Sequence, residues 1–304
     1  MTTSNNETYI TISELLSEIV ENKWKLVLVN LLAIIMGVLL ILFLPKKYEA
    51  EVILAPVSQG GSGSLGNLAN QFGGLASLAG ISLGGGENDK ALHAQTILVS
   101  WDFIEKFIEQ NNLAAKVFAV KSWDKASNTL SFDEGLYNQA TGEWTVEGGE
   151  SLKPTSWELF EEFEDILRVS QDTQTGLVKI SIEHHSPEVA KLWVDLLVES
   201  INNHMRSLDI QDSKKNIEYL NEQIEKTSIA EMQKIFYQLI EEQTKTLMLA
   251  HATQEYVLKT ISPAKIPEEK SFPSYILIAL GAAVLGAFLS FIVIVLSILR
   301  KVGK

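Results

Sequence analysis

The sequence predicts an α+β membrane protein in which two transmembrane helices flank an α/β base domain that carries a long projecting helical hairpin. Two uncharged apolar runs lie near the ends of the chain, and strand-like and helical segments alternate between them. One continuous helical pattern is too long to belong to a compact globule. The chain has 304 residues and a net charge of −13. It has no cysteine, which is compatible with a domain that needs no disulfide bonds.

The two apolar runs cover residues 26–44 and 275–299, and Asn30 is the only strongly polar member of the first. At about 1.5 Å per residue, either run can cross a hydrocarbon core of roughly 30 Å. A core helix of a soluble protein is the alternative, but helices that are apolar on all sides at this length are uncommon in small soluble chains. The first run is also too long for a signal peptide and lacks a small-residue cleavage site. We therefore expect two membrane spans.

The flanking charges predict the topology. Arg300, Lys301 and Lys304 follow the second run without an acidic neighbour, which favours cytoplasmic termini. Residues 11–24 begin with a capping box and place their apolar side chains on one helical face, as in a helix lying on a membrane surface. The expected divisions are a cytoplasmic amphipathic segment (1–25), a first span (26–44), an extracytoplasmic domain (45–272), a second span (275–299) and a cytoplasmic tail (300–304).

The segment between the spans is acidic. Residues 46–272 contain 20 basic and 34 acidic side chains. This balance argues against nucleic acid as a partner, because phosphates are bound by Lys and Arg.

Within this segment, residues 48–54 alternate apolar and charged side chains and are expected to form a strand. The next predicted elements are a glycine-rich loop (58–86), a helical segment (90–113) with Ser100 capping its second half, a polar region of loops and short strands (118–155) and a β-hairpin that turns at Gly176.

The longest predicted element is a helical arm over residues 187–253. Ser186 is placed to cap its first helix, and Pro187 suits the first turn. The chain should reverse where Ser228 and Glu231 match a second capping box. A helix of about 60 Å with few apolar residues in its outer half must pack on its return helix or on neighbouring copies. The outer half retains a thin apolar seam at coiled-coil spacing: Ile217, Leu220 and Ile224.

After the arm, residues 255–262 are a further strand candidate. Pro263, Pro267 and Pro273 follow, and they exclude a helix and keep the linker to the second span extended. We expect these prolines to fix the domain to the membrane.

Small residues recur in both spans and are candidates for helix packing, within or between subunits. The alternative is that small residues are simply frequent in membrane spans. The candidate packing residues are Ala33, Gly37, Gly281, Ala282, Gly286 and Ser290.

Two sequence matches to catalytic motifs fail on context. Residues 60–66 (GGSGSLG) fit a dinucleotide-binding loop, and residues 80–84 (GISLG) fit a serine nucleophile elbow at Ser82. Neither lies in the strand–helix setting that its chemistry requires. The neighbours His184 and His185 should point to opposite faces of a strand end, and the other histidines lack a metal-binding spacing. We therefore expect no catalytic residue, no cofactor site and no metal site.

Taken in order, several segments resemble the Wzz-type chain length determinants, also called polysaccharide co-polymerases. The likeness covers nearly the whole chain. It rests on the first span followed by YEAEVIL, and then on SLAGISLG, LVSWDFIEKFIEQNNL, HSPEVAKLWVDLLVESIN and EYVLKTISPAKIPEEKSFP, which leads into a glycine-containing second span.

The resemblance implies a non-enzymatic protein of the Gram-negative inner membrane, with a periplasmic base, a helical arm and a ring-like homo-oligomer. It implies control of the modal length of O-antigen or a related surface polysaccharide, alongside the membrane polymerase. The growing polysaccharide and the lipid bilayer are further expected partners. The chain resembles the class without a kinase domain, and residues 118–155 do not match the commonest family members. A periplasmic adaptor for polysaccharide or substrate export is the alternative function.

Overall fold

The computed structural model describes residues 22–57 and 87–302. The expected amphipathic helix, the glycine-rich loop and both motif matches therefore lie wholly or mostly outside the described residues. The chain divides into two compact units: residues 47–270, and the two terminal segments that contain the apolar runs. The mixed helix-and-sheet fold class with two candidate transmembrane helices is confirmed.

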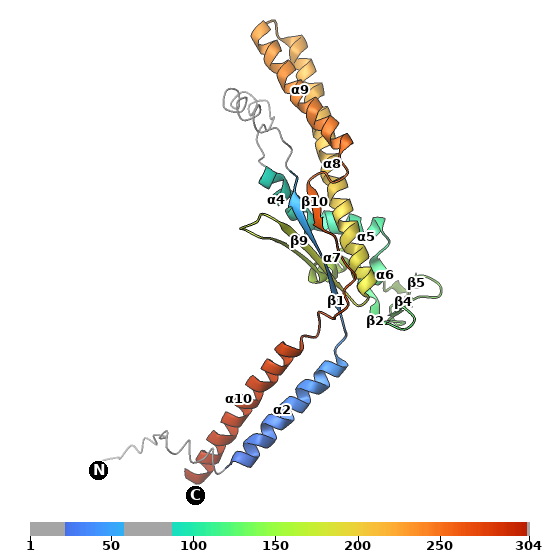
Figure 1. Cartoon of the computed structure of the whole chain (residues 1–304). Coiled ribbons are helices and arrows are strands. Elements are labelled where there is room, and N and C mark those ends of the chain that lie inside the picture. Colours follow the sequence, from blue (N-terminus) through green and yellow to red (C-terminus); the bar gives the residue numbers. More distant parts are fainter. Residues whose placement is uncertain (1–21, 58–86, 303–304) are drawn as a thin grey trace, which may run out of the picture. The chain divides into compact units, whose positions relative to one another are not determined.

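The first unit is a pair of long helices, α2 (Lys23–Phe43) and α10 (Tyr275–Val302), which pack against each other (Figure 1). Only 6% of the apolar window of α2 and 11% of that of α10 are buried. A core helix of a soluble protein would be mostly buried, so the exposed apolar surface of both helices suits a hydrocarbon environment.

The second unit is built on an antiparallel sheet with the strand order β10-β1-β9-β8. Its register pairs Tyr48 with His184 and Leu54 with Val178. Alternate residues of β1 are buried, so one face of the sheet covers the core and the other carries charged side chains such as Glu51. The strands are β1 (Tyr48–Pro56), β8 (Leu167–Gln171), β9 (Val178–His184) and β10 (Leu258–Ser262).

The hairpin between β8 and β9 turns at the predicted glycine. Gly176 has a φ of +71°, in the left-handed region where a side chain is disfavoured. The Asp172 carboxylate accepts hydrogen bonds from the backbone N–H groups of residues 174 and 175, and these bonds lower its pKa.

Short helices complete the core beside the sheet, two of them in contact with its strands and two packed on one of these. They are α4 (Glu87–Leu98), α5 (Trp101–Gln110), α6 (Ala114–Phe118) and α7 (Ser156–Ile166). The segment predicted as residues 90–113 is thus divided between α4 and α5. Ser100 is the N-cap residue of α5, but the expected capping bond is absent, because its hydroxyl donates instead to the carbonyl of Ile97. Helix α7 does have a complete capping box, formed by Thr155 and Glu158.

Residues 118–155 form three small β-hairpins, β2–β3, β4–β5 and β6–β7, as the prediction of loops with short strands implied. Their strands are β2 (Val120–Asp124), β3 (Thr129–Phe132), β4 (Tyr137–Asn138), β5 (Glu143–Trp144), β6 (Val146–Glu147) and β7 (Glu150–Ser151).

The arm consists of α8 (Pro187–Lys226) and α9 (Ala230–Ala252), which run side by side, and their outer halves extend past the sheet (Figure 1). Ser186 caps α8 by accepting a hydrogen bond from the N–H of Val189, at 3.4 Å. The inner half of α8 lies on the sheet and buries its apolar stripe, including Trp193 and Leu197, in the main core.

The second capping box predicted at the reversal is wrong. Helix α9 begins at Ala230, its N-cap residue is Ile229, and no side chain caps it. The turn is closed differently: the Thr227 hydroxyl accepts from the N–H of Ile229, and the Gln233 side chain donates to the carbonyl of Thr227. Ser228 therefore precedes the N-cap position by one residue and cannot cap the helix.

Candidate functional site

Small residues form the contact between the candidate spans. A Cβ atom added at Gly37 would lie 3.1 Å from the Cβ of Ala282, and one added at Gly286 would lie 3.4 Å from the Cβ of Ala33. The helix backbones thus approach as closely as glycine permits. Gly281 differs, because a Cβ added there would meet nothing within 4 Å. Of the predicted packing residues, Gly281 therefore lies off this contact.

A polar bond crosses the same contact. The Asn30 amide donates to the Ser290 hydroxyl at 2.8 Å and to its own helix at the carbonyl of Leu26. A bond of this kind between membrane helices contributes about 0.6–2 kcal/mol. The sequence analysis placed Ser290 in the packing row but missed its partner. The signal was available, since Asn30 is the only strongly polar residue of the first apolar run.

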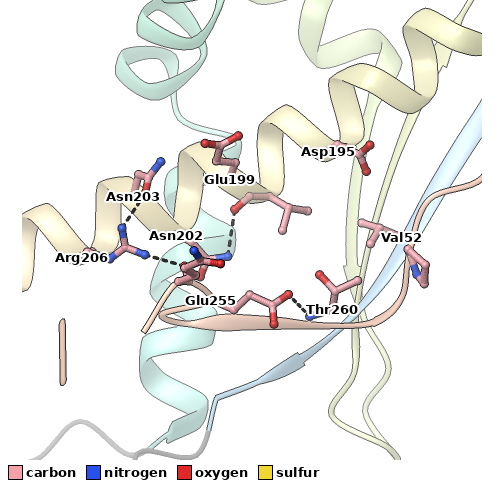
Figure 2. Close-up of a pocket in the computed structure, with 11 residues that line it drawn as sticks. Val52, Asp195, Glu199, Asn202, Asn203, Arg206, Glu255 and Thr260 are labelled. Carbon is pink, nitrogen blue, oxygen red and sulfur yellow. Dashed lines mark hydrogen bonds between the residues drawn. The ribbon is translucent and has the colours of Figure 1, made fainter. Parts of the chain in front are cut away.

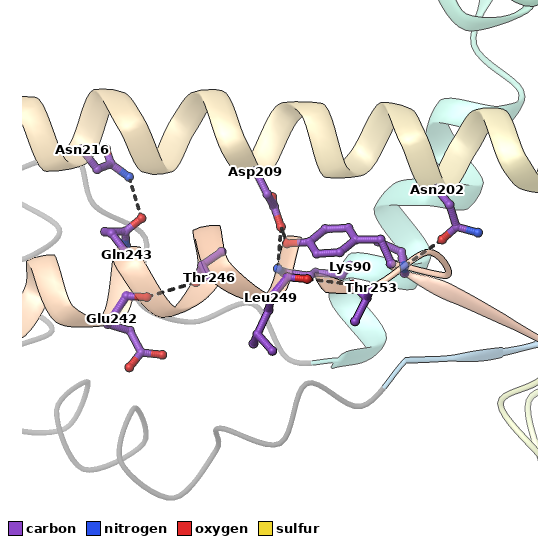
Figure 3. A network of polar contacts seen from close by, with 11 residues as sticks. Lys90, Asn202, Asp209, Asn216, Glu242, Gln243, Thr246, Leu249 and Thr253 are labelled. Atoms are coloured by element: carbon purple, nitrogen blue, oxygen red, sulfur yellow. Dashed lines mark hydrogen bonds and ion pairs between the residues drawn. The ribbon is translucent and has the colours of Figure 1, made fainter. Parts of the chain in front are cut away.

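The root of the arm is fixed by a buried asparagine on α8. Asn202 is 3% exposed, and its side-chain oxygen accepts from the N–H groups of Val257 and Leu258 at 2.8 and 3.1 Å. Its amide group donates to the carbonyls of Val198 and Leu258, each at 3.0 Å. The side chain thus holds the segment that leads from α9 into β10 (Figure 3). The apolar stripe of α8 hid this residue from sequence reasoning.

Two turns further out along α8, Asp209 joins three segments (Figure 3). Its carboxylate accepts from the Tyr256 hydroxyl at 2.6 Å and from the Lys90 ammonium at 2.7 Å. The Lys90 nitrogen also lies 5.7 Å from the centre of the Tyr256 ring. Tyr256 is 1% exposed, so its hydroxyl needs this acceptor. The contacts tie α4 to the point where the arm leaves the base.

Beside this root lies a polar recess of about 540 Å³, between α8, β1 and the edge strand β10 (Figure 2). Arg206 donates to the carbonyls of Thr253 and Gln254 at 2.9 and 2.6 Å, so its charge lies at the C-terminal end of α9. Pro263, predicted as a membrane-proximal residue, lines the recess. The recess also contains three carboxylates, those of Asp195, Glu199 and Glu255.

The other two prolines of the predicted motif lie in extended chain. The segment 263–274 contains no helix, as the prolines predict, with Pro267 in the domain unit and Pro273 in the unit of the apolar helices.

The outer half of the arm has a small core of its own. Leu220 and Leu239 are buried between α8 and α9. A polar layer, with buried Ser213 and a 3.4 Å bond from Asn216 to Gln243, separates this pair from the main core. The partly buried Ile235, Phe236 and Ile240 complete the outer core. Other apolar side chains of the arm remain exposed, namely Tyr219 (43%), Ile229 (60%), Tyr237 (59%) and Met248 (66%).

One member of the histidine pair, His184, is buried and hydrogen-bonded within the domain. His184 is buried, its Nδ1 accepts from the N–H of Ser186 at 3.0 Å, and its Nε2 lies 3.2 Å from the Lys116 carbonyl, to which it donates. Burial lowers the pKa of His184 to about 4, so the ring is neutral at pH 7. Residues 22–57 and 87–302 contain no cluster of three or more His, Cys, Asp or Glu side chains suited to a metal ion.

Comparison with known proteins gives a family match. The model of the Wzz family, described as chain length determinant protein, matches residues 8–111. No curated protein sequence matches the chain.

Two solved structures are similar. A full-length bacterial polysaccharide co-polymerase has 10% sequence identity and a TM-score of 0.38, over 96% of this chain and 99% of that one. A fragment of WzzB, a polysaccharide co-polymerase from Salmonella Typhimurium, has 13% identity and a TM-score of 0.30, over 74% of this chain and 99% of the fragment. Identities and TM-scores this low do not establish a relationship, so the likeness to chain length determinants depends on the family model.

The fold and its surfaces define a class of protein: an α/β unit with a helical arm, together with a pair of apolar helices long enough to cross a membrane. The family model adds a likeness to one group of such proteins over part of the chain. Residues 8–111 match the Wzz family of chain length determinant proteins, which confirms the resemblance seen in the sequence.

Proposed function

We propose that this protein is a non-enzymatic inner-membrane scaffold that regulates the modal chain length of O-antigen or a related surface polysaccharide. The observation that carries the proposal is the family match over residues 8–111, which includes the first apolar helix, β1 and α5.

The proposed topology places both termini in the cytoplasm and residues 45–272 in the periplasm. Its support is the basic end of the chain, where Arg300, Lys301 and Lys304 follow the second apolar run. In this arrangement the spans hold the protein beside the membrane polymerase, and the arm extends into the periplasm next to the growing polymer.

The proposed mechanism is geometric and depends on a homo-oligomer. The exposed apolar side chains of the arm support it, because a single hairpin leaves them in water. Several arms packed around an axis would bias the moment at which the polymerase releases its product. Mass photometry of the full chain in detergent tests the assembly step. Tyr237→Glu with Met248→Glu should shift the particles to lower mass, whereas Val146→Glu, at an exposed apolar residue outside the arm, should not.

The function itself is tested on a gel of the surface polysaccharide from the native host, with the gene, without it and with it restored. We expect the ladder to lose its preferred length without the gene, while polymer of other lengths is still made. A ladder that keeps its mode contradicts the proposal. Complete loss of exported polymer also contradicts it, and would favour the export adaptor.

A further inference from the structure

The β2–β3 and β4–β5 hairpins border an open hollow against the beginning of α8, which we call the insertion pocket. Its volume is about 380 Å³, within the roughly 300–1,000 Å³ that is usual for ligand pockets. Segments far apart in sequence line it: α6, the turn between β2 and β3, strands β3 and β4, the turn after β4, and the beginning of α8. The hollow is distinct from the contacts at the root of the arm and between the spans, although Ser186 and Val189, which form the cap of α8, also line it.

One wall of the insertion pocket is aromatic. Phe132 and Tyr137 line it, with ring centres 5.4 Å apart, and Trp144 continues the row at 5.3 Å from Tyr137. All three rings are only partly buried. Half-exposed aromatic rings present an apolar face beside polar groups, which is the surface that the C–H face of a sugar ring covers.

Part of the remaining lining is polar, and hydrogen bonds hold two of its side chains in place. The Asn128 amide donates to the Glu188 carboxylate at 2.7 Å, while its oxygen accepts from the Trp123 indole at 2.9 Å. Glu188 is thereby oriented and keeps further acceptor positions for hydroxyl groups, since a carboxylate offers about four. The lining also includes Gln139, whose amide can both donate and accept.

The charges of the insertion pocket indicate an uncharged ligand. Lys116 and Glu188 contribute one positive and one negative group to the lining, in a chain whose net charge is −13. An anionic ligand would meet the carboxylate and a cationic one the ammonium group. A neutral polyhydroxyl compound can use both, with its apolar face against the aromatic row.

We propose that the insertion pocket binds a neutral pyranose segment of a saccharide. The sugar ring lies against Tyr137, and its hydroxyl groups bond to Glu188 and Gln139. That this saccharide is the polymer whose length is regulated rests on the proposed function. The site would then bind the polymer at the base of the molecule, separately from any contact made by the outer half of the arm.

Saturation-transfer NMR and calorimetry on the full chain in detergent test the site. The probes are oligosaccharides of one to four repeat units, released from the host's surface polysaccharide. Tyr137→Ala should weaken binding at least tenfold, and Glu188→Gln and Gln139→Ala each several-fold. The two polar variants guard against a failure of the Tyr137→Ala hairpin to fold. Trp157→Ala is the matched control, because Trp157 is an exposed aromatic residue (49%) outside the pocket; it should bind like the parent.

Absence of saturation transfer from the parent chain to the oligosaccharide overturns the site. Binding by all three pocket variants that equals that of the parent also overturns it. A change in particle mass in these variants without sugar binding also overturns it, and shows that a second copy occupies the hollow. The polysaccharide gel separates the two proposals. If the ladder depends on the gene but no oligosaccharide binds, the site is wrong and the proposed function stands. If binding depends on the pocket but the ladder keeps its mode without the gene, the sugar site stands and the proposed function is wrong.

Discussion

Mild acid should destabilise the base domain through one buried histidine. His184 is 4% exposed, and both nitrogens of its neutral ring are used, one accepting from Ser186 and one donating to Lys116. Its ring also lies 4.9 Å from that of Trp193, which is fully buried. Protonation would remove the acceptor at Nδ1 and place a charge in the core. Burial therefore lowers the pKa of His184 to about 4.

The size of the effect follows from proton linkage. In the unfolded chain the pKa of a histidine is about 6.5, so between that value and the folded value of about 4 only the unfolded state binds the proton. The free energy of unfolding therefore falls as the pH falls through this window. Lowering the pH from about 7 to about 5 should cost about 2 kcal/mol, out of about 3 kcal/mol for the whole window.

Other shifted groups act largely outside this interval. The pKa values of Asp124, Glu158 and Asp172 are lowered by hydrogen bonds from neighbouring hydroxyl and backbone N–H groups. Their stabilisation is lost only below the ordinary carboxyl range. The pKa of Lys179 is raised by its bond to Glu51, and that contribution is lost only at alkaline pH. His204 acts in the same direction as His184, because burial lowers its pKa too.

Urea unfolding of the full chain in detergent, followed by tryptophan fluorescence at about pH 7 and pH 5, measures the effect. The parent and the His185→Gln control should each lose about 2 kcal/mol over this interval. His184→Gln should be less stable at pH 7 but lose well under half as much on acidification. A parent chain equally stable at both pH values, or a His184→Gln variant with the full loss, would refute the reasoning.

Three further predictions concern single contacts. In this cysteine-free chain, Gly37→Cys with Ala282→Cys should form a disulfide within one subunit on oxidation, read on a non-reducing gel and by peptide mass. The Cβ positions lie 3.1 Å apart, so the helices need to separate only slightly to reach the roughly 3.5–4.5 Å that a disulfide spans. Gly37→Cys with Gly281→Cys should not form one, and cross-linked dimers alone would contradict the packing. Asn202→Leu should lower the free energy of unfolding by about 2–5 kcal/mol, since it strands two buried N–H groups, and a loss under about 1 kcal/mol in urea would show that the bonds are dispensable. Trp193→Phe should cost about 1 kcal/mol, against about 3–5 kcal/mol for Trp193→Ala, because the buried indole N–H has no partner among the described residues; equal losses in a thermal melt would contradict this.

Local patterns predicted most of the elements. The proline and capping serine before α8 fixed its start, and the alternation in residues 48–54 identified β1, because each depends on neighbours within a few residues. The reversal of the arm was misread for a related reason. A Ser-x-x-Glu pattern is a capping box only if the helix starts directly after the serine. Here α9 starts two residues after Ser228, and the Thr227 hydroxyl accepts from the N–H of Ile229 instead.

Contacts between distant segments could not be predicted. The partner of Asn202 lies 55 residues further on, and that of Asn30 lies 260 residues away. Polarity within an apolar pattern signals that a partner exists but does not identify it. The insertion pocket is a still harder case. Its aromatic row and its glutamate are each ordinary in sequence, and only the folding of the short hairpins against α8 brings them together.

The two units differ in what they leave uncovered, and this difference indicates where assembly should be driven. The small residues of α2 and α10 already meet within one chain, and the rest of their apolar surface suits lipid. In the proposed topology the exposed apolar side chains of the arm face water. Burying them between copies would stabilise the assembly by about 25 cal/mol for each Å² of apolar surface removed from water. Variants of Tyr237 and Met248 should therefore reduce particle mass more than Gly286→Leu does. If Gly286→Leu dissociates the particles and the arm variants leave them intact, the spans and not the arms hold the copies together.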